Sequence, residues 1–255
     1  MISNRNDFRC ASLWQLLFVR LLMLFVPFFL ISKPAIAANV HMGNPHYNKE
    51  GFFDMHVCNW PDRPLFFMTL FSTTHFDEIK KIEVFDNNKR LLGQLDLTKY
   101  RTVMLEKPKR EKRVFLMQIE IPKTCGDGWY SSKVYLKDGE VVTAKDYVII
   151  YKMARATGMQ PAPNSILNKI PKTLSWNPIP GAKYYQVFID DVWNGNRLYS
   201  SDLLSKPGLK LPKNLLTPDG TYCWKIHARD INEDVLLGDF NHGSLTKCFE
   251  FDIKG

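Results

Sequence analysis

Apolar and polar residues alternate in short runs along most of the chain, and turn-forming residues separate the runs. The alternation is clear at residues 52–57 and 80–85, and it is typical of strands whose side chains point to two faces in turn. Asp138-Gly139 separates residues 129–136 from the next run, 141–151, which indicates a hairpin. No stretch shows a sustained helical period, so the pattern predicts an all-β fold.

The strand-like runs fall into two groups with a different stretch between them. Seven or eight runs over about 110 residues predict a β-sandwich at residues 38–153. Residues 154–165 contain Pro161 and Pro163 and no apolar pattern, so we expect a linker there. The remaining runs predict a second β-sandwich at residues 166–255.

The first 37 residues differ from the rest and predict a secretory signal peptide. Arg5 and Arg9 precede an apolar run at residues 21–31, and the small residues Ala35 and Ala37 stand where signal peptidase reads the chain. An uncleaved membrane anchor is the alternative, but 11 apolar residues fall short of the roughly 20 that span a bilayer. We expect cleavage after Ala37 and a periplasmic or secreted protein.

The cysteine count fits an exported chain. Four cysteines follow the leader, namely Cys58, Cys125, Cys223 and Cys248. An even number predicts two disulfides. Three pairings are possible, and we expect Cys58–Cys125 and Cys223–Cys248 because each pair then lies within one predicted sandwich.

The faces of the last two predicted strands permit the second of these bridges. If Tyr222 and Trp224 face the core, Cys223 faces outward, and the same alternation in the final strand turns Cys248 outward. Two outward cysteines on neighbouring antiparallel strands are placed for a cross-strand disulfide. Closing a loop of about 25 residues contributes roughly 3 kcal/mol in the chain-entropy treatment.

Short motifs in residues 166–255 resemble those of fibronectin type III domains. They are Leu174-Ser175-Trp176, Pro180-Gly181-Ala182, the alternation of Tyr185, Val187 and Ile189, and Leu216-Thr217-Pro218-Asp219-Gly220-Thr221-Tyr222. The resemblance implies that Trp176 packs in the core and that the Tyr222 hydroxyl hydrogen-bonds back across the corner. A Cys223–Cys248 bridge departs from the usual family pattern. The first unit resembles an immunoglobulin-like sandwich in strand count and cysteine number, although Cys125 precedes a Gly-Asp-Gly turn.

Charge changes this picture only slightly. The chain has 34 Lys and Arg against 26 Asp and Glu, a net charge of +8. The leader holds four basic residues and one acidic residue, so its removal leaves 30 against 25, a net charge of +5. This mild excess does not indicate a nucleic-acid partner.

A basic run at residues 107–113 holds five positive charges in seven residues. We expect a solvated hairpin tip between two strands. The alternative is a salt-sensitive contact of Lys109, Arg110 and Arg113 with an anionic membrane surface or polymer.

Outward aromatic residues of the second unit are the other binding candidates. Tyr184 and Phe188 share the outer face of one predicted strand, and Trp193 follows closely. Aromatic faces stack on sugars or anchor a protein partner. Packing against the first unit or the linker is the alternative.

Metal binding and catalysis have weaker signals. Cleavage after Ala38 would leave His41 third in the chain, which suits Cu(II) or Ni(II), with His46 nearby; cleavage after Ala37 spoils that geometry, so no metal site is expected. The sequence has no Gly-x-Ser-x-Gly elbow, no His-Glu-x-x-His pair and no phosphate-binding glycine loop. We therefore expect neither an enzyme nor a bound cofactor.

These observations favour a non-catalytic binding or scaffold protein of the bacterial cell envelope or secreted space. Its partner would be an envelope protein or a surface glycan, held by strand edges, loops and outward aromatic residues. The alternatives are an accessory carbohydrate-binding module and a metal-handling periplasmic protein that uses His41 and His46.

Overall fold

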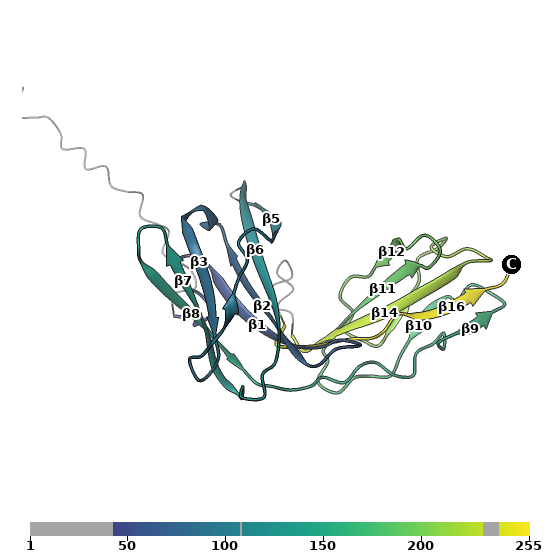
Figure 1. Ribbon diagram of the computed structural model, residues 1–255. Coiled ribbons are helices and arrows are strands. Elements are labelled where there is room, and N and C mark those ends of the chain that lie inside the picture. The colour runs from purple at the N-terminus through teal and green to yellow at the C-terminus, as the bar shows by residue number, and fades with distance from the viewer. Residues whose placement is uncertain (1–42, 108, 232–239) are drawn as a thin grey trace, which may run out of the picture. The chain divides into compact units, whose positions relative to one another are not determined.

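The chain folds into β-structure. The computed structural model describes residues 43–107, 109–231 and 240–255, so the predicted leader and His41 lie outside the described residues. Within those ranges the chain forms strands and one short 3-10 helix, η1 (Phe76–Glu78), which confirms the all-β prediction (Figure 1). No described segment is a helix long and apolar enough to cross a membrane.

The first half of the described chain has two facing layers (Figure 1). Its strands are β1 (Phe52–Asn59), β2 (Phe66–Thr73), β3 (Ile79–Phe85), β4 (Leu91–Gln94), β5 (Tyr100–Glu106), β6 (Lys109–Glu120), β7 (Gly128–Leu136) and β8 (Val141–Val148). One layer has the order β1-β2-β6-β5 and the other β4-β3-β7-β8. Alternation turns Phe53, Phe67 and Tyr130 into a shared core, whose burial drives the two layers together.

The second half encloses a core of its own. Its strands are β9 (Ser165–Leu167), β10 (Thr173–Ser175), β11 (Tyr184–Asp191), β12 (Arg197–Ser200), β13 (Gly208–Lys210), β14 (Thr221–Arg229), β15 (His242–Leu245) and β16 (Phe249–Ile253). Trp176 and Trp224 lie at its centre, with ring centroids 6.2 Å apart. The Tyr222 ring is also buried, and its hydroxyl accepts a hydrogen bond from the Thr217 amide at 2.8 Å.

Residues 154–165, the predicted linker, pack on the second core. Ala156 and Met159 are buried in it, and Gln160 exchanges two backbone hydrogen bonds with Ser175, at 2.8 and 3.0 Å. Ala156 and Met159 are three positions apart, so they do not follow the strand alternation on which the sequence prediction relies.

One sheet runs through both halves. β15 pairs antiparallel with β14 and parallel with β1, where Val57 lies opposite His242. Side chains reinforce this junction: the Asn59 amide donates to the Met153 carbonyl at 2.8 Å, and Ser244 donates to the Ala154 carbonyl at 2.7 Å. The halves are therefore joined by a hydrogen-bonded ladder, where the sequence predicted only a linker.

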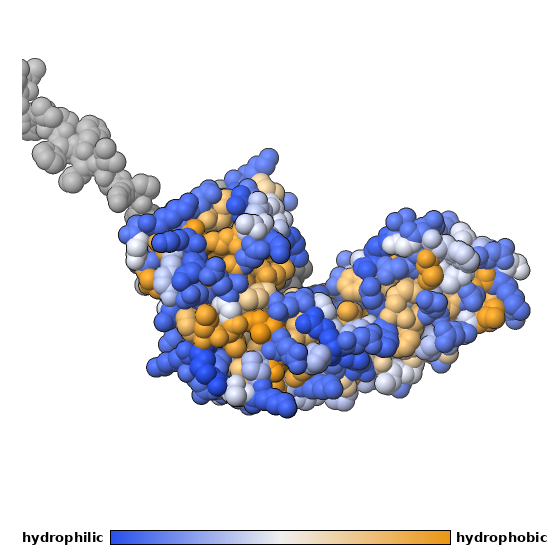
Figure 2. Space-filling model, viewed as in Figure 1, coloured by the Kyte–Doolittle hydropathy of each residue, from blue (hydrophilic) through white to orange (hydrophobic). Residues whose placement is uncertain are grey.

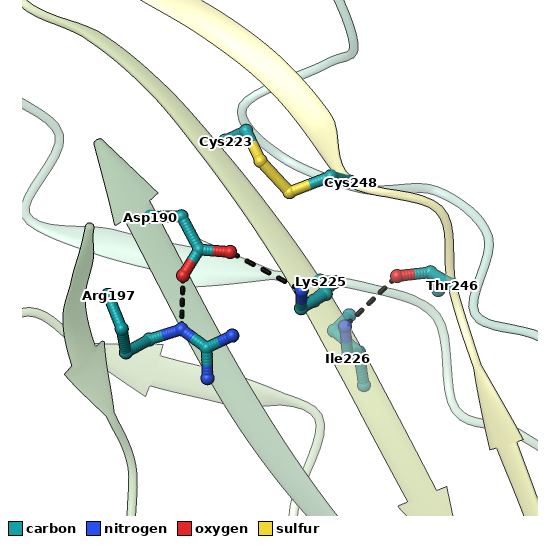
Figure 3. The surroundings of a disulfide bond; sticks show 7 residues. All are labelled: Asp190, Arg197, Cys223, Lys225, Ile226, Thr246 and Cys248. Atoms are coloured by element: carbon teal, nitrogen blue, oxygen red, sulfur yellow. Dashed lines mark hydrogen bonds and ion pairs between the residues drawn. A yellow bond between two sulfur atoms is a disulfide. The ribbon is translucent and has the colours of Figure 1, made fainter. Parts of the chain in front are cut away.

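The predicted Cys223–Cys248 disulfide is present (Figure 3). Its cysteines lie 5.4 Å apart at Cα, beside the register pair Trp224–Phe249 of β14 and β16. Nearby, the Asp190 carboxylate lies between Arg197 and Lys225 (Figure 3). Burial opposes ionisation of Asp190, but the hydrogen bond from Arg197 and the charge of Lys225 prevail and lower its pKa.

The predicted Cys58–Cys125 disulfide is wrong, because both thiols are free. Phe53, Met55 and Val57 face the first core, so Cys58 points to the opposite face of β1, where it is buried with other apolar side chains. Cys125 packs on the core side. The prediction paired these cysteines because they lie in the same predicted unit, and it did not consider that one lies on the core side and the other on the opposite face. Burial raises the pKa of the Cys58 thiol to about 12, which makes it unreactive.

His242 binds to acceptors on two sides of the junction. Its Nδ1 lies 2.7 Å from the Asp230 carboxylate and its Nε2 lies 2.7 Å from the Ile149 carbonyl oxygen. A carboxylate and a carbonyl both accept, so only the protonated imidazole donates to both. Burial opposes the charged ring, but the hydrogen bonds and charge of these partners raise its pKa above the ordinary 6.5.

We expect this contact to make stability depend on pH. Because the folded pKa of His242 is raised, its contribution is complete below pH 6.5 and is lost as pH rises through the folded value. The pKa of Asp230 is lowered: burial opposes ionisation, but the hydrogen bonds and charge of His242 outweigh it. Its contribution is therefore present above its ordinary pKa of 3.8 and lost in stronger acid.

Chemical denaturation measures the free energy of unfolding. The difference in this free energy between wild type and His242→Gln should be larger at pH 5.5 than at pH 8.5. Asp230→Asn should remove most of that trend, and a difference constant with pH would contradict the assignment.

Candidate functional site

The outer face of the four-stranded sheet carries the strongest candidate for a binding site. Four aromatic side chains project from it, and we call this surface the aromatic face: Phe85, Trp129, Tyr135 and Tyr147. Its geometry follows from the β7–β8 hairpin, where Gly139 adopts φ +94°, a value that favours glycine. The hairpin sets Trp129 opposite Tyr147, and the burial of Tyr130 on the core side turns both outward.

Trp129 and Tyr147 form an exposed aromatic pair at one end of this face. Their ring centroids lie 5.3 Å apart in an edge-to-face arrangement at 76°. The two residues are 50% and 52% exposed. An edge-to-face contact holds each ring in place, so the pair offers a preformed apolar surface whose side-chain freedom is already reduced.

Polar groups at the other end of the face bind one another. Glu83 accepts hydrogen bonds from Lys81 at 2.7 Å and from the Tyr135 hydroxyl at 2.8 Å, and these bonds lower its pKa. The Lys81 ammonium lies 4.2 Å from the Tyr135 ring centroid, and the Lys133 ammonium lies over the Phe85 ring. Donors and acceptors thus stand beside apolar rings at cross-strand spacing.

The apolar surface continues past β8. Ile149 is 51% exposed, and Tyr151 is also exposed, with its ring edge-on to His242 at 5.5 Å. Hydrophobic residues form separate patches among hydrophilic ones on the visible side of the molecule (Figure 2). A surface of exposed rings flanked by hydroxyl, ammonium and carboxylate groups suits a ligand with both C–H and O–H faces, as sugars have.

The aromatic residues singled out in the second half lie apart from this face. Tyr184 and Phe188 project from the outer side of β11 and are half-buried. The Arg197 guanidinium lies 4.6 Å from the Phe188 ring centroid and covers it. Trp193 is 80% exposed in the turn after β11. Of the three, only Trp193 presents an open aromatic surface.

The basic run belongs mostly to a strand. We predicted a hairpin tip at residues 107–113, but β6 begins at Lys109 and pairs with β5 throughout residues 109–113. Lys109 and Arg110 are exposed there. Arg113 stacks on two rings, with its guanidinium 3.7 Å from the Phe76 centroid, and pairs with Glu111 at 2.9 Å. This leaves Lys109 and Arg110 for an anionic partner.

Sequence reasoning overlooked Trp129 and Tyr147 although a signal was present. The hairpin at Asp138-Gly139 was recognised, and counting outward from it brings residue 129 near residue 147. Alternation then sets Trp129 on the opposite side from Tyr130. Combining the two rules would have predicted the exposed pair.

Three groups of side chains in the described ranges have ligand atoms close enough for a metal ion. One consists of Asp190 and the cysteines of the disulfide, whose sulfur atoms are already bonded to each other. The others are Glu50–His75–Glu78 and His46–Asp54–Asp146. His46 was a candidate from the sequence, and its partners were not.

Fold and face together define an all-β protein with an exposed aromatic surface. No family model matches the chain, and no curated protein matches it. One similar solved structure is dimeric latent PorU from Porphyromonas gingivalis, at 11% identity and a TM-score of 0.27, covering 81% of this chain and 20% of that one. Another is SGBP-B of the Bacteroides ovatus mixed-linkage glucan utilization locus, in complex with a mixed-linkage heptasaccharide, at 12% identity and a TM-score of 0.21, covering 76% and 42%. The chain thus spans less than half the length of either protein, and scores this low do not define a shared fold.

Proposed function

We propose that the protein is a non-catalytic binding protein of the cell envelope or secreted space and that its aromatic face binds a surface glycan. The observation that supports this most directly is the exposed Trp129–Tyr147 pair. Exposed rings that contact each other on the outer face of a sheet leave apolar area in water, and a ligand that covers them removes that area from water.

The neighbouring polar groups support a sugar as the ligand. Lys145 and Ser131 lie opposite each other in the ladder, in the position next to Trp129 and Tyr147. A pyranose stacked on a ring presents hydroxyl groups at its edge, within reach of such donors and acceptors. Among these residues the three lysines Lys81, Lys133 and Lys145 outnumber the one acid, Glu83. We therefore propose a neutral or acidic glycan over a basic one.

A protein partner held by the second half is the other candidate. Trp193 at 80% exposure supports it, because tryptophan is enriched among residues that dominate protein interfaces. Tyr184 and Phe188 would contribute less, since both are half-buried.

Substitution on the aromatic face tests the proposal. Trp129→Ala should weaken binding to a polysaccharide identified on a glycan array by about tenfold or more, and Tyr147→Ala should act similarly, because each removes ring surface that the sugar covers. Isothermal titration against that polysaccharide gives the affinities.

Trp193→Ala is the matched control, since it removes an even more exposed tryptophan. It should leave glycan affinity unchanged. Loss of binding in Trp193→Ala with full binding in Trp129→Ala would overturn the assignment to the aromatic face. A wild-type protein that binds no glycan on the array would overturn the proposal itself.

A further inference from the structure

Along part of the β1 edge, backbone amides donate hydrogen bonds to a side chain and to the segment that precedes β1. β15 pairs with β1 only from Val57 onward. Earlier in the strand, the Phe53 amide donates to the His46 carbonyl at 2.8 Å, and the Met55 amide donates to the Asp146 carboxylate at 2.8 Å. His46 precedes β1 and Asp146 comes from β8, so two distant segments meet at this edge.

A buried cluster of ligand-type side chains lies at that edge. His46, Asp54 and Asp146 each offer one atom, and these atoms all lie within 4.8 Å of one another. His46 Nε2 is 3.5 Å from Asp146 Oδ1. The Asp54 and Asp146 side chains are 1% and 4% exposed, against 28% for His46. The cluster is therefore enclosed on the carboxylate side and open to solvent at the imidazole.

Hydrogen bonding sets the imidazole for coordination. His46 Nδ1 lies 3.0 Å from the Phe53 carbonyl oxygen, and a carbonyl only accepts, so Nδ1 carries a proton. In the neutral ring, Nε2 then presents its lone pair to the Asp146 carboxylate. Two acceptors that face each other in a buried place favour a cation between them. A backbone carbonyl on one ring nitrogen and a metal on the other is the usual arrangement for histidine ligands.

Hydrogen bonds hold both buried carboxylates in place. Asp54 is paired with the buried His56, at 2.7 Å from Nε2. Asp146 lies in the same enclosed place and accepts a hydrogen bond from the Met55 amide at 2.8 Å. The protein therefore fixes the orientation of both carboxylates.

We propose that His46, Asp54 and Asp146 bind a divalent transition-metal ion, of which zinc fits best. Zinc takes nitrogen and oxygen ligands at about 2.0–2.2 Å in a tetrahedron, which separates ligand atoms by about 3.4 Å. The 3.5 Å between His46 Nε2 and Asp146 Oδ1 agrees with that spacing. Calcium requires six to eight oxygen ligands, more than three side chains supply. The fourth zinc position would face solvent beside His46, and His56 would orient Asp54.

Zinc titration of the full mature protein tests the site. Chelator-treated protein should bind one equivalent of Zn²⁺ here at pH 7.5, and Co²⁺ should give the visible absorption of a tetrahedral site. His46→Gln and Asp146→Asn should each weaken Zn²⁺ binding by about tenfold or more. Zinc should also raise the melting temperature of the wild type and not of these variants. His41→Ala serves as the common background, because it removes the alternative N-terminal ligand.

His75→Gln is the matched control. His75 has the same 28% side-chain exposure as His46 and also lies near two acids, Glu50 and Glu78, but at 3.9 and 3.7 Å. It should leave Zn²⁺ affinity unchanged. Equal affinity in wild type and His46→Gln, or loss in His75→Gln alone, would overturn the assignment. His46 is partly exposed, so its replacement leaves the core intact and this outcome is decisive even if Asp146→Asn fails to fold. Glycan binding by the aromatic face is measured separately and does not depend on this result.

Discussion

Replacing Trp224 by alanine should lower the free energy of unfolding by about 3–5 kcal/mol, the usual cost of removing a large aromatic side chain from a core. Trp224 is fully buried at the centre of the second core, against Trp176. Urea denaturation followed by far-ultraviolet circular dichroism measures the loss.

Trp193→Ala provides the control for residue type. Its side chain is mostly in water, so its removal should change stability by less than about 0.5 kcal/mol. β14 holds Trp224 and pairs with β15, which pairs with β1. We therefore expect the Trp224→Ala protein to unfold in one transition that includes the first half. A variant in which the first half keeps wild-type stability would contradict that coupling.

Removing the Cys223–Cys248 disulfide is the second large perturbation. The bridge joins residues 25 apart. Without it the unfolded chain gains conformational freedom, so the free energy of unfolding should fall by about 3 kcal/mol. The Cys223→Ala/Cys248→Ala double variant should show this loss in denaturant titrations. A reducing agent should produce a similar loss in the wild type.

The same double variant supplies its own control. A reducing agent should not destabilise it further, because Cys58 and Cys125 are free thiols in the structure. Peptide mapping of the wild type should find one cross-linked peptide, containing residues 223 and 248. A further loss on reduction of the double variant would mean that Cys58 and Cys125 form a bond after all.

Local patterns in the sequence predicted much of the fold. Residues 184–190 were expected to form a strand with Tyr185, Val187 and Ile189 on one face, and β11 buries those three side chains. The hairpin at Asp138-Gly139 joins β7 and β8 as expected. In both cases the alternation and the turn residues lie within about ten positions of each other, so the signal is local.

Contacts between distant segments could not be predicted in this way. β15 is four residues long and contains Gly243, a poor strand former. Nothing local indicates that it pairs with β1. The cluster at His46 has the same origin, since Asp146 approaches it from β8. The faces of Cys58 and Cys125 likewise depend on which strands meet across the core, and the expected bridge between them was wrong for that reason.

The parallel pairing of β1 with β15 has a consequence for the order of events during synthesis. Roughly 180 residues separate the two strands, so at ordinary translation rates β1 leaves the ribosome about 10–40 s before its partner. Throughout that interval the C-terminal end of β1 presents unpaired backbone groups to the surroundings. A nascent chain in that state is open to strand addition by another copy. Until the C-terminus arrives, strand addition at that segment therefore competes with the pairing of β1 and β15.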